Sequence, residues 1–254
     1  MVFLKIKDIV KKVQKLIIVL IIFVFAWETF IWIFDINSLI LPHLFEMFSE
    51  LINNFNYIFS NILITFYTAL LGCCLGAVVA ITLSIAMVYN KFCEEIFYPI
   101  IVFSQTIPIL VIAPILIIWF GVGLMSKVVI AAMLSFFPLV VNLNTGFRSV
   151  KEETLELLKI YGANKFQIFF KVRVYSAMSF FFAGLKTAIT LSFIGAIVGE
   201  FVSSEKGIGH LVIMADNELE IPLEFAAIFF LSIISYLIYH MVLQIEKKVI
   251  YWQV

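Results

Sequence analysis

The segment "LELLKIYGANKFQIFFKVR" (residues 155–173) carries charges in a helix-like pattern, yet it lies in a chain that is otherwise strongly apolar. The 254 residues are 63% hydrophobic and only 13% charged, whereas soluble domains are about a quarter charged. Because so few charges cannot cover a water-soluble surface, the composition predicts an all-α, polytopic membrane helix bundle. We expect the polar segment to lie outside the bilayer.

Six segments are long and apolar enough to cross a membrane, which requires about 20 mainly apolar residues. These segments are residues 16–34, 62–89, 97–120, 128–147, 177–201 and 224–244. The first follows a lysine-rich start, but its apolar run is too long for a signal peptide and no cleavage site follows. We therefore predict six transmembrane helices, with the first one retained.

The lysines and arginines predict the direction of these spans, because cytoplasmic connections carry the excess of positive charge. The residues predicted to lie on the inner side are Lys5, Lys7, Lys11, Lys12, Lys15, Lys91, Arg148, Lys151, Lys159, Lys165, Lys171, Arg173, Lys247 and Lys248. Lys127 and Lys206 would face outside, where the connections are acidic, and Lys186 is expected to extend from its span to the headgroups. Both termini are predicted to be cytoplasmic.

Residues 151–173 form the longest predicted inner connection. Leucines recur at helical spacing in its first half, Gly162 suits the left-handed residue that closes a helix, and Asn164 with Gln167 resembles the capping box of a second helix. Two roles remain open for this helix–turn–helix. It would either rest in the lipid headgroups as an amphipathic segment or insert apolar anchors into a groove on another protein.

The same segment resembles the cytoplasmic motif of binding-protein-dependent ABC import permeases, through "GANKFQIFFKV" (162–172), the preceding Glu156 and the following "AGLKTAIT" (183–190). Three more stretches resemble the branch that serves sulfonates, taurine, nitrate and related small molecules. They are "PIIVFSQTIPILVIAPILIIWFGVG" (99–123), "FFPLVVNLNTGFRSV" (136–150) and "GEFVSSEKGIGHLVIMA" (199–215). The resemblance covers nearly the whole chain, most strongly residues 57–246.

The resemblance implies a type I ABC importer permease fold with a cytoplasmic coupling helix in residues 151–173, in a multi-pass protein of the inner (plasma) membrane. The residues implied to contact the ATPase are Glu156, Gly162, Ala163, Asn164, Phe166, Phe169 and Phe170. It divides the chain into residues 1–56 (N-terminal segment, first span and periplasmic connection), the permease core (57–246) and a cytoplasmic tail (247–254).

The implied assembly is a homodimer of this chain with two ATPase subunits and a periplasmic or lipid-anchored substrate-binding protein, and it involves no nucleic acid. No Gly-x-x-x-x-Gly-Lys-Ser/Thr sequence occurs in the chain. ATP would therefore be bound and hydrolysed by the partner, and the chain itself is expected to be non-catalytic and to hold no cofactor or metal.

The sequence departs from the family motif in two places. Leu157 and Leu158 replace two alanines, and the prolines expected after the short helix are replaced by Tyr175 and Ser179. Because proline breaks a helix, their absence predicts a less bent exit from residues 151–173.

Polar side chains inside the spans are candidates for the transport pathway, because burying them in lipid is costly. The candidates are Ser104, Gln105, Thr106, Pro108, Asn142 and Glu200. For the group around Pro108 the alternative is a kink whose polar groups are satisfied internally, and for Glu200 it is simple exposure at the outer interface.

Two glycine patterns and one glycine-containing loop carry further expectations. The pairs Gly72/Gly76 and Gly195/Gly199 predict close helix packing, or alternatively dimerisation. In the outer connection 203–221, glycines permit a tight turn, and the resemblance implies an elbow that contacts the binding protein. The contact residues would be Gly207, Gly209 and His210; the alternative is a solvated loop.

Taken together, the residues and the resemblance predict the permease subunit of an ABC importer. Its substrate would be a small nutrient of the sulfonate, taurine, nitrate or thiamine-pyrimidine-precursor type. An ion-coupled carrier that works alone is the main alternative, but the paired buried acids or repeated halves typical of one are not evident. A membrane enzyme and a membrane scaffold are further alternatives.

Overall fold

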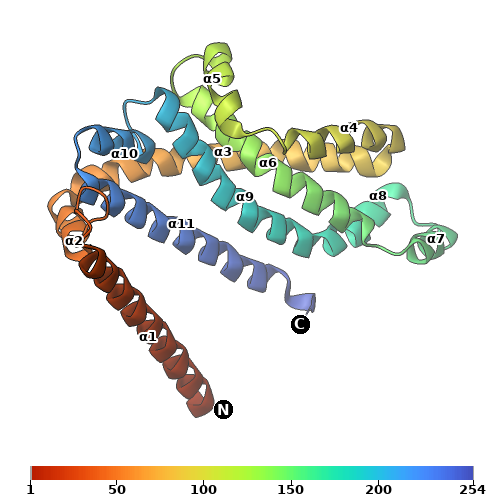
Figure 1. Ribbon diagram of the computed structural model, residues 1–254. Helices are drawn as coiled ribbons and strands as arrows, with labels where there is room; N and C mark the ends of the chain where they lie inside the picture. The colour runs from red at the N-terminus through yellow and green to blue at the C-terminus, as the bar shows by residue number, and fades with distance from the viewer. Residues whose placement is uncertain (1, 254) are drawn as a thin grey trace. The chain divides into compact units, whose positions relative to one another are not determined.

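The computed structural model describes the backbone of residues 2–253 and the side chains of residues 14, 18, 19 and 21–252. Helices and loops make up the described residues, which contain no strand. The helices are α1 (Val2–Phe34), α2 (Leu44–Asn53), α3 (Phe55–Tyr89), α4 (Lys91–Ser104), α5 (Ile109–Phe120), α6 (Leu124–Arg148), α7 (Glu152–Ile160), α8 (Lys165–Ile168), α9 (Val174–Ser203), α10 (Ile208–Asn217) and α11 (Ile221–Val249). A π-helical turn (Phe169–Arg173) joins α8 to α9, and a 3-10 turn (Tyr251–Gln253) follows α11 (Figure 1). The five predicted inner lysines of the N-terminal segment lie outside the described side chains.

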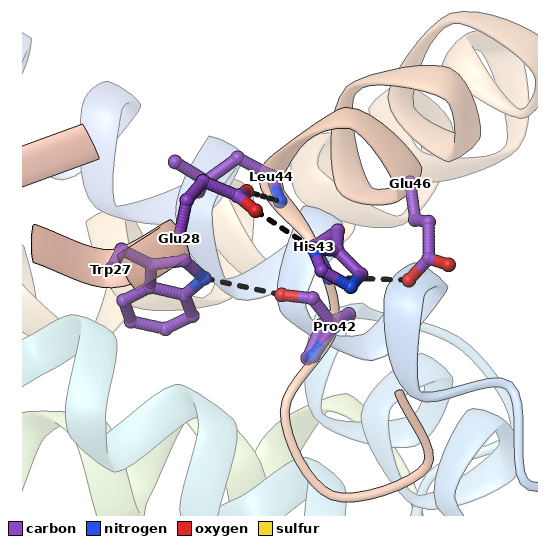
Figure 2. Close-up of polar contacts among 6 residues, drawn as sticks. All are labelled: Trp27, Glu28, Pro42, His43, Leu44 and Glu46. Atoms are coloured by element: carbon purple, nitrogen blue, oxygen red, sulfur yellow. Dashed lines mark hydrogen bonds and ion pairs between the residues drawn. The ribbon is translucent and has the colours of Figure 1, made fainter. Parts of the chain in front are cut away.

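The chain divides into two compact units, residues 1–56 with 212–229, and residues 57–211 with 230–254. In the first unit, α2 is fixed at the end of α1 by the polar contacts drawn in Figure 2. Trp27 Nε1 donates to the Pro42 carbonyl at 3.1 Å, and Glu28 accepts both from the Leu44 amide at 2.9 Å and from His43 Nδ1 at 2.7 Å. The hydrogen bond to Glu28 raises the pKa of His43, because it favours the charged imidazolium.

The core of the second unit is built around α6. Helices α6 and α9 lie side by side over most of their length (Figure 1), and α3 approaches α6 at two glycines. A Cβ atom at Gly76 would lie 2.6 Å from the Ala132 carbonyl oxygen, and one at Gly195 would lie 2.7 Å from Ala131 Cα. The close packing predicted from the glycine pairs is therefore confirmed. Because both pairs face α6 within this chain, they are not available as dimerisation surfaces.

The predicted third span (97–120) is not one continuous helix. Helices α4 and α5 are bent by 107° across residues 105–108. Pro108 has extended backbone angles and no N–H, so it cannot continue α4. The hydroxyls of Ser104 and Thr106 donate to the carbonyls of Ile100 and Phe103, each at 2.7 Å, which satisfies two acceptors at the break.

Among the described residues, four helices are long and apolar enough to cross a membrane, or five if α4 and α5 form one bent span. One of the four runs without interruption from Lys165 to Ser203. Tyr175 and Ser179 lie inside α9, in agreement with the less bent exit expected from the missing prolines. The first predicted span lies in α1, where the described apolar stretch is Ile21–Phe34.

Candidate functional site

The elbow region (residues 151–173) has the local structure predicted from its sequence. Gly162 ends α7 in the left-handed conformation, with φ +79°. The Ala163 amide donates to the Leu158 carbonyl and the Gly162 amide to the Lys159 carbonyl, both at 2.9 Å. These two bonds are the Schellman pattern that closes a helix at a glycine. The turn is therefore set by local sequence rather than by packing.

The capping box that begins α8 is also confirmed. The Asn164 side chain accepts from the Gln167 amide at 2.8 Å, and the Gln167 side chain accepts from the Asn164 amide at 2.9 Å. Both amides would otherwise lack a partner at the start of the helix. The elbow therefore enters α8 in one defined direction.

The second half of the elbow region is anchored to the bundle by Phe169, which is only 6% exposed. Its ring lies 5.3 Å from that of Phe147 on α6 and 5.6 Å from that of Tyr89 on α3. The Tyr89 hydroxyl donates to the Lys165 carbonyl at 3.3 Å, and Arg173 donates to the Phe147 carbonyl at 3.1 Å. The expectation that Phe169 contacts the ATPase is thus wrong, because its side chain is covered by this chain's own aromatic rings.

Several apolar side chains of the elbow region, in contrast, are exposed. Phe166 is 74% and Phe170 61% exposed, and the sequence analysis missed Ile160 and Tyr161, which are 84% and 81% exposed. Both residues directly precede Gly162, so their position beside the turn was visible in the sequence. Glu156 and Asn164 are exposed and Ala163 is half-buried. Such a group of exposed apolar side chains on an ordered turn is typical of an interaction surface.

A cavity of about 290 Å³ opens at the break between α4 and α5. Its polar lining comes from Ser104 and Gln105 at the break and from Thr187 on α9. Thr106 and Pro108 are exposed and do not line it. Asn142 is half-buried and donates to the Pro138 carbonyl at 2.7 Å. Two of the six predicted pathway residues therefore meet at one cavity, and Thr187, a hydroxyl within a predicted span, was overlooked.

Glu200 is not exposed at an interface, as one interpretation of the sequence had it, but is 1% exposed. It lies against the turn that joins α9 to α10 (residues 204–209, hereafter the Gly207 turn). Gly207 and Gly209 are buried against the Glu200 side chain, and His210 is half-buried. The two glycines cannot contact a binding protein directly, so that expectation is wrong for them.

Lys186, which was expected to extend to the headgroups, pairs with a carboxylate of this chain. Its Nζ donates to Glu246 of α11 at 2.8 Å, and the two side chains are 18% and 19% exposed. An ion pair so largely withdrawn from water ties α9 to α11, because either charge alone would be left without compensation.

Comparison with known proteins finds a family that matches most of the chain. Residues 72–251 match the family described as binding-protein-dependent transport system inner membrane component. The chain is 36% identical over 183 residues to the formylaminopyrimidine transport permease protein ThiX of Halalkalibacterium halodurans, covering 72% of this chain and 73% of that protein. It is 35% identical over 163 residues to the riboflavin transport system permease protein RibX of Chloroflexus aurantiacus, covering 64% and 61%.

A solved structure shares the fold. The inward-facing MetNI methionine ABC transporter matches with a TM-score of 0.58 and 16% identity, covering 80% of this chain and 97% of that chain. At this identity the likeness concerns the fold alone, and it agrees with the predicted ABC importer permease architecture.

Proposed function

The chain belongs to the family of binding-protein-dependent transport system inner membrane components, and from this premise we propose that its elbow region docks onto a separate ATPase. Membership makes the chain the non-catalytic, membrane-spanning permease subunit of an ABC importer, and implies ATPase and substrate-binding partners. The alternative of a carrier that works alone is thereby set aside. What remains to be assigned is which residues carry each contact.

The observation that carries the proposal is the contrast between the two faces of the elbow region. One face is held rigidly, by Phe169 packed between α3 and α6 and by the capping box of α8. The other presents Tyr161, Phe166 and Phe170 to the surroundings. A rigid support beneath exposed aromatic anchors is what a force-transmitting contact requires, because aromatic side chains in the centre of an interface contribute most of its binding free energy.

The charges of α7 favour a protein partner over lipid. Its first turn carries Glu152 and Glu153, and Glu156 is exposed in the next turn. Carboxylates at these positions are repelled by the negative potential of the cytoplasmic leaflet, which attracts basic segments instead. An amphipathic helix resting on that leaflet would carry lysines in these places.

We further propose that six spans cross the inner membrane with both termini in the cytoplasm. The spans would be α1, α3, the bent pair α4–α5, α6, α9 and α11. An even number of crossings returns the chain to the side on which it began, and the excess of lysine and arginine in the predicted inner connections supports the cytoplasm as that side. The elbow region then faces the compartment that holds ATP.

For the pathway, we propose that Ser104, Gln105 and Thr187 line the route in a homodimer of this chain. These groups donate and accept hydrogen bonds without carrying charge, which suits an uncharged heterocyclic nutrient. The printed names of the two relatives, permeases for formylaminopyrimidine and riboflavin, support a heterocycle over a sulfonate or nitrate.

Co-purification of the full-length chain with its candidate ATPase tests the docking proposal. Gly162→Pro should abolish co-purification, because proline cannot adopt φ +79° and removes the amide that donates to Lys159. Gly121→Pro is the matched control, since Gly121 has the same φ of +79° and equally open surroundings. Retained binding by Gly162→Pro, or loss in both variants, would remove the elbow region from the interface.

A further inference from the structure

We propose that Glu200 is a positioning residue that latches the Gly207 turn to α3, so that this turn and the bundle move together during transport. This inference rests on the proposed function, since it assigns a part in the transport cycle. Glu200 lies at the end of α9, where one further turn of helix ends at Ser203 and the chain reverses into α10. No other carboxylate among the described side chains is so fully buried.

The latch is made by three side chains that hold three consecutive backbone amides. The Gly207 amide donates to Asn61 Oδ1 at 2.7 Å, the Ile208 amide to Thr65 Oγ1 at 2.9 Å, and the Gly209 amide to Glu200 Oε2 at 2.9 Å. Asn61 and Thr65 lie one turn apart on α3. The first amides of α10, which have no partner within their helix, are thus satisfied by α3 and α9.

Thr65 connects the Gly207 turn to the Glu200 side chain. Its hydroxyl oxygen lies 2.9 Å from both carboxylate oxygens of Glu200 and accepts from Ile208. A hydroxyl has one proton to donate, and a carboxylate accepts only, so the chain of donation runs from Ile208 to Thr65 to Glu200. Glu200 also accepts from the Gly209 amide, so it is the acceptor at which the hydrogen bonds from α3 and from the Gly207 turn meet.

The two glycines show that the fit around this carboxylate is close. Gly207 has φ +108°, and a Cβ atom there would lie 2.5 Å from Glu200 Oε2. A Cβ atom at Gly209 would lie 2.7 Å from Glu200 Cβ and 2.8 Å from the Ile197 carbonyl oxygen. Any side chain at either position would therefore expel the carboxylate. The Gly-x-Gly pattern is therefore what makes room for the Glu200 carboxylate in the latch.

The tip of the Gly207 turn is exposed, whereas its base is tied to a third helix as well. Glu205 and Lys206 are exposed. Lys127 on α6 is buried and donates to Ser204 Oγ at 3.0 Å. A displacement of the exposed tip is therefore passed through polar contacts to α3, α6 and α9. Because these contacts are hydrogen bonds between a few groups, they can be removed one at a time without emptying the apolar core.

The first test measures the turn itself and needs no partner. Glu205→Cys is introduced into the full chain with its three native cysteines replaced, labelled with a nitroxide in nanodiscs, and examined by electron paramagnetic resonance. Glu200→Ala and Thr65→Val should shorten the rotational correlation time of the label at least threefold. Glu200→Gln and Thr65→Ser, which keep a hydrogen-bonding group, should restore most of the immobility. Ser84→Ala on α3 is the matched control, because Ser84 is fully buried and donates to Val140 outside the latch.

The second test uses the complex with the co-purifying ATPase. Addition of ATP and vanadate should change the rate at which maleimide labels Glu205→Cys. The variants Glu200→Ala and Thr65→Val should reduce that change at least threefold, while complex assembly and basal ATP hydrolysis stay within twofold.

An unchanged label mobility in both variants would overturn the latch, whatever the ATPase does. Increased mobility with an unaltered ATP response would equally overturn its part in transport. If Glu200→Ala does not assemble, Thr65→Val decides, since it removes a single hydroxyl. A chain that binds no ATPase but shows the mobility pattern would refute the proposed docking and leave the latch standing.

Discussion

Two phenylalanines of the elbow region, three positions apart, should respond to truncation in opposite ways. Phe166 is 74% exposed and Phe169 is 6% exposed. If the exposed face docks onto an ATPase, Phe166→Ala should weaken binding and leave the fold intact. Phe169→Ala should destabilise the fold, because its ring fills the space between Phe147 and Tyr89.

The magnitudes follow from the exposed area. An aromatic side chain buries roughly 200 Å², so covering the exposed three-quarters of Phe166 contributes at most about 4 kcal/mol at about 25 cal/mol per Å². Anchors of this kind typically lose about 2 kcal/mol on truncation, which corresponds to roughly 30-fold weaker binding. Truncation of a buried phenylalanine costs about 3 to 5 kcal/mol of folding free energy.

The assay measures the dissociation constant between the nanodisc-embedded chain and its ATPase, together with the apparent Tm of each variant. We expect Phe166→Ala to raise Kd with an unchanged Tm, and Phe169→Ala to lower Tm. The reasoning is refuted if Phe166→Ala binds as tightly as the wild type, or if both variants lose stability to the same extent.

Three further predictions concern other parts of the chain. The ion pair between His43 and Glu28 stabilises the α1–α2 junction below about pH 6.5. This stabilisation is lost as the pH rises through the raised pKa of His43. Because both side chains are over one-third exposed, the ion pair contributes at most about 1 kcal/mol. Amide exchange at the start of α2, corrected for the intrinsic pH dependence, should accelerate over this range, and His43→Gln should abolish the effect. Gly76→Ala should lower Tm by overpacking against α6, at about 1 to 3 kcal/mol, whereas the neighbouring, exposed Leu75→Ala should change it little. Lys186→Met should destabilise by about 3 kcal/mol, and the added change Glu246→Leu should recover most of the loss.

Each of these has a contradicting outcome. Protection at the start of α2 that is independent of pH, or that increases above neutral pH, would show that His43 does not act through its charge. A normal Tm for Gly76→Ala would mean that α3 and α6 separate without penalty. A double variant no more stable than Lys186→Met alone would locate the destabilisation in packing rather than in the unpaired carboxylate.

Sequence reasoning succeeded where the structure is set by neighbours in the chain. The closing glycine and the capping box of the elbow region involve residues three to five positions apart, so their pattern could be read directly. The break at Pro108 was visible for the same reason. Its 107° angle was not, because that angle depends on how α4 and α5 pack on the rest of the bundle.

The errors concern burial, which long-range contacts decide. Phe166 and Phe169 look alike in the sequence, and only the rings of Tyr89 and Phe147 separate their roles. Glu200 looked like an interfacial acid because its partner Thr65 lies 135 residues away. No local pattern indicates a contact between residues so far apart in the chain. The Gly-x-Gly that follows Glu200 did indicate that other atoms pack closely against the backbone of this turn.

The Lys186–Glu246 pair also constrains the order in which the protein can be assembled. Its partners are 60 residues apart in the chain, so at about 5 to 20 residues per second the lysine is synthesised several seconds before its carboxylate. During that interval a lone lysine within the Lys165–Ser203 span opposes partitioning into lipid by about 3 kcal/mol. Stable integration of α9 is therefore coupled to the arrival of α11, and truncation before Glu246 should yield a chain that is degraded rather than one that is merely inactive.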